Sequence, residues 1–151
     1  TCMGIASDLW IHCRTTLLPV VVKAGWRVLK SDFWVVRTKS DVPIAVIEVK
    51  YPGKSKLSDT RVLGQMFDYI SYLRNSFGQC EIFGIVTTLE AWQVVWLPDT
   101  DDFAASKDLN PPIYEDLHTQ FPVESTLARQ LHGSAVYRYD DSQLLPLIGT
   151  V

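Results

Sequence analysis

An apolar segment that carries two charges, two residues apart, constrains this chain more than any other feature. Residues 44–50 have the sequence IAVIEVK, in which Glu48 and Lys50 interrupt aliphatic, largely β-branched positions. Such residues favour strands, and alternate side chains of a strand lie on one face. Glu48 and Lys50 should therefore project together from a strand that is otherwise suited to burial. A buried strand rarely carries charges unless they are paired or functional.

Two further polar side chains extend this pattern along the chain. Asp32 stands before the strand-like segment 33–38, and Gln65 lies in the helical pattern of residues 57–75. Sixteen positions separate Asp32 from Glu48, which fits one antiparallel hairpin. In their order and in their placement on these elements, Asp32, Glu48, Lys50 and Gln65 resemble the motif of the PD-(D/E)xK nuclease superfamily. The resemblance implies the restriction-endonuclease-like fold.

Hydrophobic periodicity predicts a mixed α/β fold. We expect helices at residues 6–17 and 57–75, and strands at 20–23, 26–30, 33–38, 44–50, 79–87 and 91–97. The second helix has the strongest pattern, because Ser58 or Asp59 can cap it and its apolar positions form one stripe: Val62, Met66, Phe67, Ile70 and Leu73. This order of elements matches the core of the resembled superfamily over about residues 6–98. The expected fold class is α/β, a restriction-endonuclease-like core with a mixed central sheet flanked by helices.

The length of 151 residues predicts a single domain, with a C-terminal extension at residues 99–151 that the resemblance does not cover. There we expect a loop at 99–112, a helix at 123–132, a strand at 135–139 and a short helix capped near Asp141. No apolar run approaches the roughly 18 residues that span a bilayer, so we expect no membrane segment. The chain begins with Thr1 and shows no leader pattern. We therefore expect it to be cut from a longer protein with flanking domains.

The distribution of charge indicates which partners the protein could bind, and the cysteine content indicates in which cellular compartment it could act. The net charge is −3, yet residues 23–61 carry nine basic and four acidic side chains, whereas the rest of the chain carries five basic and thirteen acidic ones. The basic excess coincides with the motif, where a polyanion would bind, although a solvated basic surface is the alternative. Cys2, Cys13 and Cys80 are odd in number and lack CxxC spacing. This pattern favours a reducing, intracellular compartment over a disulfide framework or a structural zinc site.

The resemblance also implies a role for each motif residue. Asp32 and Glu48 would ligate Mg²⁺, which Mn²⁺ could replace, with the Val49 carbonyl as a third ligand. Lys50 would orient or deprotonate the attacking water and counter the charge that develops on the phosphate. Gln65 would position the water or a phosphate oxygen. The predicted nucleic-acid contacts beside this site are Lys54, Lys56 and Arg61.

Ordinary structural roles compete with each of these assignments. An E-x-K pattern is often a surface salt bridge, a residue in the position of Asp32 is often a turn residue, and a helical glutamine such as Gln65 usually faces solvent. Lys54 and Lys56 are equally consistent with plain solubilising lysines. The chain also departs from the motif, since Ser31 stands where proline is common and Asp8 is the one candidate for a further acid on the first helix. Whether there are one or two metals stays open.

We expect a Mg²⁺-dependent nuclease that hydrolyses phosphodiester bonds, in DNA rather than RNA. A narrower resemblance, to the nuclease modules of Crinkler-type effectors, would imply action in a nucleus. The main alternative is a catalytically inactive nuclease fold that binds nucleic acid or a protein partner. A third possibility is a module that associates with itself, for example as a homodimer. It would use exposed apolar residues of the tail: Leu144, Leu145, Leu147 and Ile148.

Overall fold

The computed structural model describes residues 9–12, 17–22, 25–37, 40–53, 57–98, 112–120 and 130–144. These segments form ten strands and one helix, α1 (Thr60–Phe77). The strands are β1 (Leu9–His12), β2 (Leu17–Val22), β3 (Gly25–Lys30), β4 (Phe33–Arg37), β5 (Val42–Val49), β6 (Phe83–Thr87), β7 (Ala91–Trp96), β8 (Ile113–Tyr114), β9 (Leu131–Gly133) and β10 (Tyr137–Arg138).

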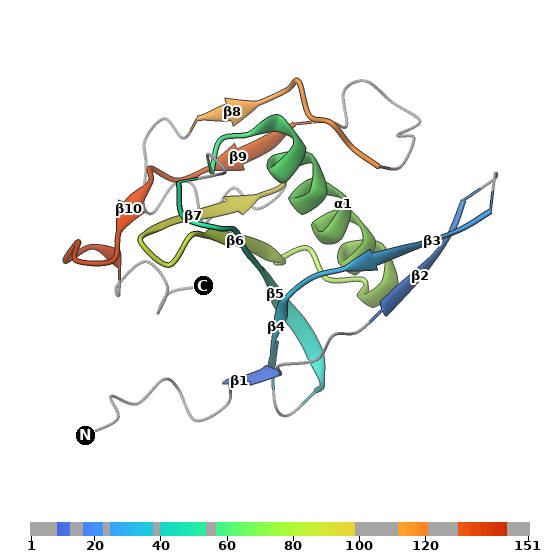
Figure 1. The fold of residues 1–151 in the computed structure, drawn as a ribbon. Helices are drawn as coiled ribbons and strands as arrows, with labels where there is room; N and C mark the ends of the chain where they lie inside the picture. Colours follow the sequence, from blue (N-terminus) through green and yellow to red (C-terminus); the bar gives the residue numbers. More distant parts are fainter. Residues whose placement is uncertain are drawn as a thin grey trace.

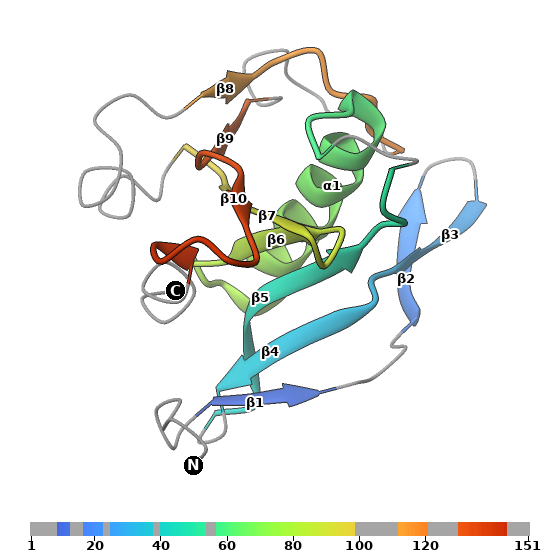
Figure 2. The same ribbon diagram turned by 60° about the vertical axis from the view of Figure 1, so that its left-hand side comes forward.

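Eight of the strands form one mixed sheet. Its order is β1-β4-β5-β6-β7-β9-β8, and β10 pairs with β7 outside this path. The pairs β1–β4, β4–β5 and β6–β7 are antiparallel, whereas β5 and β6 are parallel and are connected through α1. The strands β2 and β3 form a separate antiparallel hairpin that projects from the sheet on the side of α1 (Figures 1 and 2).

The parallel pair explains why α1 covers one face of the sheet. A connection between parallel neighbours must cross over the sheet, and a helix is its usual form. The larger core cluster lies between α1 and the sheet, with Val46, Val86 and Val95 facing the helix. A smaller cluster with Ala45 and Ile85 lies on the opposite face. Odd and even positions of β5 therefore face different environments, and the even positions face α1.

The sequence of α1 accounts for its limits and its buried side. The Asp59 side chain accepts a hydrogen bond from the backbone N–H of Arg61 at 2.8 Å and caps the first turn. Gly78 ends the helix with φ 63°, a left-handed conformation that glycine adopts without strain, and its N–H donates to the Arg74 carbonyl. All five expected apolar positions are buried, which confirms the stripe: Val62, Met66, Phe67, Ile70 and Leu73.

Within the described segments, most expected elements of the core are present. The strands expected at 33–38 and 44–50 correspond to β4 and β5 and pair as the expected antiparallel hairpin, and those at 79–87 and 91–97 correspond to β6 and β7. The helix expected at 57–75 is α1, and the segments at 20–23 and 26–30 lie in β2 and β3. The coarse class, α/β with a mixed sheet, is confirmed.

Other expectations were wrong. Instead of the helix at 6–17, residues Leu9–His12 form β1, and β2 already begins at Leu17. Pairing with the edge of β4 supplies hydrogen bonds that outweigh the helical spacing of the apolar residues. Leu131–Gly133, at the end of the helix expected at 123–132, forms β9, while residues 121–129 lie outside the described residues. The described part thus contains one helix, α1, rather than a sheet flanked by several helices.

The described part of the C-terminal extension packs against the core. Residues 131–133 pair with β7, and the segment 112–120 lies along the N-terminal half of α1 (Figure 1). Leu144, one of the apolar residues considered for self-association, is only 6% exposed, so it is not available to a partner. The three other tail residues of that set, like most of the loop expected at 99–112, lie outside the described residues. No described helix combines the length and the apolar character that crossing a membrane requires.

Candidate functional site

Strand register brings Asp32 and Glu48 together. Phe33 of β4 pairs with Ile47 of β5 in an antiparallel arrangement, so the residue before Phe33 lies opposite the residue after Ile47. These residues are Asp32 and Glu48. The backbone N–H of Val49 donates to Asp32 Oδ2 at 2.8 Å, which ties the β3–β4 connection to the end of β5. Asp32 is exposed, whereas Glu48 is only 6% exposed.

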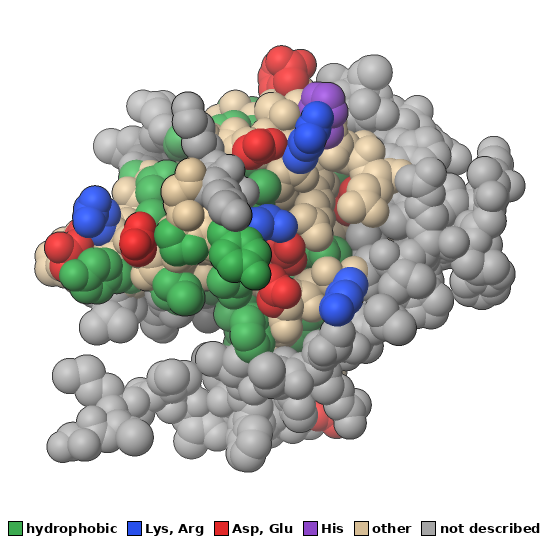
Figure 3. Space-filling model, in the orientation of Figure 1, with side chains coloured by type: hydrophobic (Ala, Val, Ile, Leu, Met, Phe, Trp, Pro, Cys, Tyr) green, Lys and Arg blue, Asp and Glu red, His purple; other side chains and the backbone are tan. Residues whose placement is uncertain are grey.

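Glu48 and Lys50 lie on the face of the sheet that α1 covers. Val46 packs against α1, and alternate residues of a strand share a face, so Glu48 and Lys50 follow it on the same side. Lys50 Nζ donates to Glu48 Oε1 at 2.6 Å and to Gln65 Oε1 at 3.0 Å. The ammonium group therefore connects the end of β5 with α1. Figure 3 shows acidic and basic side chains next to one another near the middle of the side of the molecule that faces the viewer, beside hydrophobic ones.

The hydrogen bonds continue from Gln65 to Tyr69, one helical turn further. Gln65 Nε2 donates to the Tyr69 hydroxyl at 2.6 Å, and that hydroxyl donates to the Lys30 carbonyl at the end of β3. An ammonium group can only donate, so the amide oxygen of Gln65 must face Lys50 and its nitrogen must face Tyr69. The chain of contacts thus fixes the orientation of the amide and holds Lys50 between the sheet and the helix.

Burial alters the acid–base properties of this cluster. The pKa of Glu48 is raised above the ordinary value of 4.5, chiefly because burial disfavours its charged form; Lys50 opposes this effect and the charge of Asp32 adds to it. Glu48 Oε2 is buried and has no hydrogen-bond partner among the described residues. Burial and the charge of Glu48 also raise the pKa of Tyr69, so its hydroxyl stays protonated and can donate to Lys30.

The donor set fits a hard divalent cation that keeps several waters. The described residues contain no group of three or more His, Cys, Asp or Glu side chains that could hold a metal. They do contain two carboxylates at adjacent strand ends, one of which has a buried oxygen without a partner. Mg²⁺ prefers oxygen ligands and commonly uses one or two carboxylates together with water. Asp32, Glu48 and the Val49 carbonyl are therefore a chemically suitable set.

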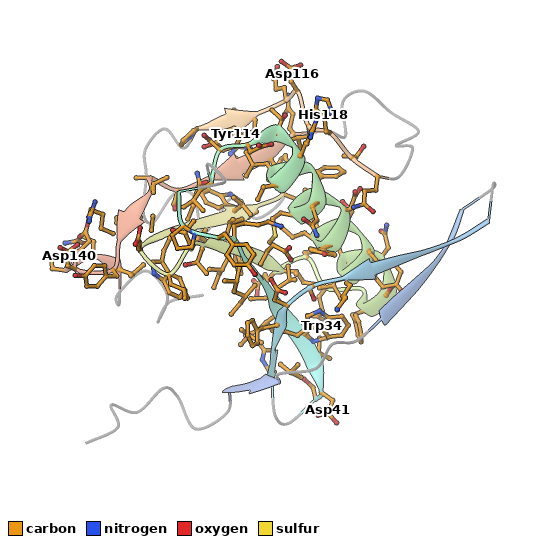
Figure 4. The ribbon with its side chains drawn as sticks, in the orientation of Figure 1. Trp34, Asp41, Tyr114, Asp116, His118 and Asp140 are labelled. Atoms are coloured by element: carbon orange, nitrogen blue, oxygen red, sulfur yellow. The ribbon has the colours of Figure 1, made fainter. Side chains whose placement is uncertain are left out.

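A second group of contacts stabilises the loop that carries Asp32. Ser31 is 1% exposed, and its Oγ accepts a hydrogen bond from Trp34 Nε1 at 2.5 Å. The Trp34 side chain lies at the start of β4 and packs against the larger core cluster (Figure 4). Trp96 is 1% exposed, and Trp92 packs against the smaller cluster. These tryptophans contribute to packing.

The structure brings together some of the predicted site residues and not others. Asp32 contacts the Val49 backbone, and Glu48 and Gln65 both contact Lys50. Arg61 is exposed in the first turn of α1. Lys54 and Lys56, like Asp8, lie outside the described residues.

Tyr69 was not predicted from the sequence, although its position four residues after Gln65 places both on one side of a helix. Glu48 is buried, so the E-x-K pattern is not a surface salt bridge. Comparisons of the chain with protein-family models, with curated proteins and with solved structures found no match.

Proposed function

We propose that this domain is a Mg²⁺-dependent nuclease that hydrolyses phosphodiester bonds, in DNA rather than RNA. One observation carries the proposal: a buried carboxylate and a lysine two residues apart on β5 contact a helical glutamine, while a second carboxylate lies at the adjacent strand end. These are the four residues whose order in the chain resembles the PD-(D/E)xK motif. Burial of such a cluster is unfavourable in free energy, because Glu48 loses solvation that a single lysine replaces only in part.

The chemistry of phosphodiester hydrolysis accounts for each member of the cluster. Asp32, Glu48 and the Val49 carbonyl would hold Mg²⁺, which when bound neutralises phosphate charge and makes a water more nucleophilic. Lys50 is held by two acceptors, and its charge would stabilise the developing negative charge on the phosphate. Gln65 keeps Lys50 in place through its amide oxygen. Hydrolysis then adds water across the P–O bond and releases a phosphate and a hydroxyl end.

The arrangement of elements around the cluster supports a restriction-endonuclease-like core. An antiparallel hairpin, β4–β5, is followed by a helix and by the parallel strand β6, and the motif residues lie on β5, its neighbouring loop and α1. The proposal includes the narrower hypothesis of a Crinkler-type effector module that acts in a nucleus. The resemblance of the motif region alone supports that hypothesis.

A nuclease assay on plasmid DNA, single-stranded DNA and RNA tests the proposal. We expect cleavage with Mg²⁺ or Mn²⁺, no cleavage with EDTA, and loss of cleavage in Glu48→Gln. The matched control is Asp41→Asn, because Asp41 lies at the far end of the β4–β5 hairpin and is exposed (Figure 4). A folded wild-type protein that cleaves none of these substrates with either metal would exclude the nuclease.

A binding module without catalysis is the second candidate, and one contact favours it. Lys50 Nζ lies 2.6 Å from Glu48 Oε1 and occupies an oxygen that a metal could use. A fold relative that had lost metal binding would keep such a pair to satisfy the buried carboxylate. Isothermal calorimetry with Mg²⁺ distinguishes the two, since the binding module should take up no metal while it still binds nucleic acid.

A further inference from the structure

A pocket of about 400 Å³ opens beside the proposed catalytic residues. Six residues from three parts of the chain line it: Lys50, Arg61, Val62, Gln65, His118 and Gln120. Lys50 and Gln65 belong to the cluster described above, so one end of the pocket is the proposed catalytic centre. The opposite wall comes from the C-terminal extension, which the resemblance to known nucleases does not cover.

The wall formed by the extension is fixed to α1 at three points. The N–H of His118 donates to the Thr60 carbonyl at 3.1 Å, and the N–H of Gln120 donates to the buried carboxylate of Asp68 at 2.7 Å. Between them, the backbone approaches Gly64 so closely that a Cβ there would lie 2.2 Å from the His118 carbonyl oxygen. Figure 4 shows His118 beside the N-terminal end of α1. The position of His118 is therefore set by direct packing on the helix.

The lining is suited to an anion. Lys50 and Arg61 are cationic, and His118 and Gln120 carry side-chain N–H groups, while Val62 is the one apolar residue. No carboxylate is among the lining residues. The nearest helical carboxylates, Asp59 and Asp68, already accept backbone hydrogen bonds. Among the described residues, no carboxylate forms a salt bridge with Arg61. Its guanidinium group is therefore available to a ligand.

We infer that this pocket binds a nucleotide of the substrate strand next to the scissile phosphate. Arg61 and His118 contact the phosphodiester of that nucleotide, and Gln120 donates to its sugar or base. The volume lies in the range of pockets that hold small organic ligands, so it accommodates a nucleotide and not only a phosphate group. This inference rests on the proposed function, because it assumes that the scissile phosphate of the nucleic acid lies at Lys50. It makes the extension part of the substrate-binding surface.

Binding without cleavage is the first test. A fluorescein-labelled single-stranded oligodeoxythymidylate is titrated in EDTA and followed by anisotropy, with wild type, Arg61→Ala and the double variant His118→Ala with Gln120→Ala. We expect each to weaken binding about tenfold, because hydrogen bonds to a charged group are lost. Arg61→Ala should also lower the slope of log affinity against log salt by about 1. Arg138→Ala is the matched control, since Arg138 is an exposed cation on β10.

A scan with neutral methylphosphonates locates the contact. One linkage of the oligonucleotide at a time is replaced, and wild type should lose affinity at the linkage that occupies the pocket. Arg61→Ala should show no further loss at that position, because the charge pair is already gone. All three substituted side chains are exposed, and the backbone contacts of the extension stay intact, so melting temperatures should match wild type.

The outcomes separate this inference from the proposed function. Unchanged affinity in both pocket variants, together with metal-dependent cleavage by wild type, would overturn the pocket and leave the nuclease in place. Pocket-dependent binding without any cleavage would support the pocket and overturn the nuclease. No binding of the oligonucleotide by wild type would overturn the pocket as well.

Discussion

Replacing Tyr69 by phenylalanine removes one hydroxyl from the chain of hydrogen bonds that runs from Glu48 through Lys50 and Gln65 to Lys30. The hydroxyl accepts from Gln65 Nε2 and donates to the Lys30 carbonyl, and Tyr69 is 1% exposed. The substitution leaves the ring and its packing unchanged. It should therefore report on the hydrogen bonds alone.

Two effects of different size are expected. Losing the two part-buried hydrogen bonds, to the Gln65 amide and to the Lys30 carbonyl, should lower the free energy of unfolding by about 1–3 kcal/mol, since each contributes about 0.5–1.5 kcal/mol. In addition, the Gln65 amide loses its fixed orientation, so its oxygen no longer holds Lys50 at all times. A hydrogen bond to a charged group contributes about 1.5 kcal/mol, so kcat should fall about tenfold.

Steady-state cleavage and thermal unfolding of Tyr69→Phe measure these effects, with Tyr72→Phe as the control. Tyr72 lies on the same helix and packs against the same core, and its hydroxyl forms no hydrogen bond with a described residue. We expect kcat to fall with little change in KM, because the proposal gives Tyr69 a positioning role without contact to the substrate. On a Gln65→Ala background, Tyr69→Phe should cause no additional loss of kcat. A lower melting temperature with an unchanged kcat would refute the positioning role.

Three further predictions concern the carboxylates and the surface beside them. Asp32→Asn should weaken Mg²⁺ binding by calorimetry, whereas Asp41→Asn should not; equal affinities would exclude the metal site. The pKa of Glu48 is raised in the native state, so ionisation of Glu48 lowers the stability of the protein as pH rises from about 4.5 through that raised value. Glu48→Gln should therefore be more stable than wild type at neutral pH, and this difference should disappear at acid pH. A difference in melting temperature that did not vary with pH would contradict this. Tyr51 is 79% exposed directly after Lys50, so Tyr51→Ala should weaken single-strand binding through loss of base stacking, by about 1–3 kcal/mol; an unchanged affinity in the anisotropy titration would argue against stacking.

The sequence predicted the elements whose local pattern agrees with their tertiary surroundings. α1 has a capping Asp59, an apolar stripe and a terminal Gly78, and β5 is a mostly apolar run that suits burial on both faces. The residues Glu48 and Lys50 could be placed on one face from the period of a strand alone. The resemblance implied that Gln65 belongs to the same site, but its contact with Lys50 was not predicted.

Other features depend on partners that are distant in sequence. The apolar residues of 9–12 have helical spacing, yet pairing with β4, more than twenty residues away, makes them a strand. Tyr69 is fixed by a backbone carbonyl 39 positions earlier, and no local pattern identifies that partner. The same holds for His118, whose place beside Arg61 results from backbone hydrogen bonds to α1. Sequence periodicity does not encode such contacts, and the pocket could not be predicted.

The measurement that tests the nuclease most directly is the single-turnover cleavage rate of Lys50→Ala, measured with Mg²⁺ together with its affinity for the same DNA. Because the proposed mechanism has Lys50 act on the developing phosphate charge, we expect the rate to fall by about 100-fold, or about 3 kcal/mol, while affinity falls far less. The substitution removes the ion-pair partner of Glu48 and could affect folding or metal binding. Melting temperature and Mg²⁺ affinity are therefore measured to establish that the variant is folded and binds the metal. A folded, metal-binding Lys50→Ala protein that cleaves DNA at the wild-type rate would contradict the account.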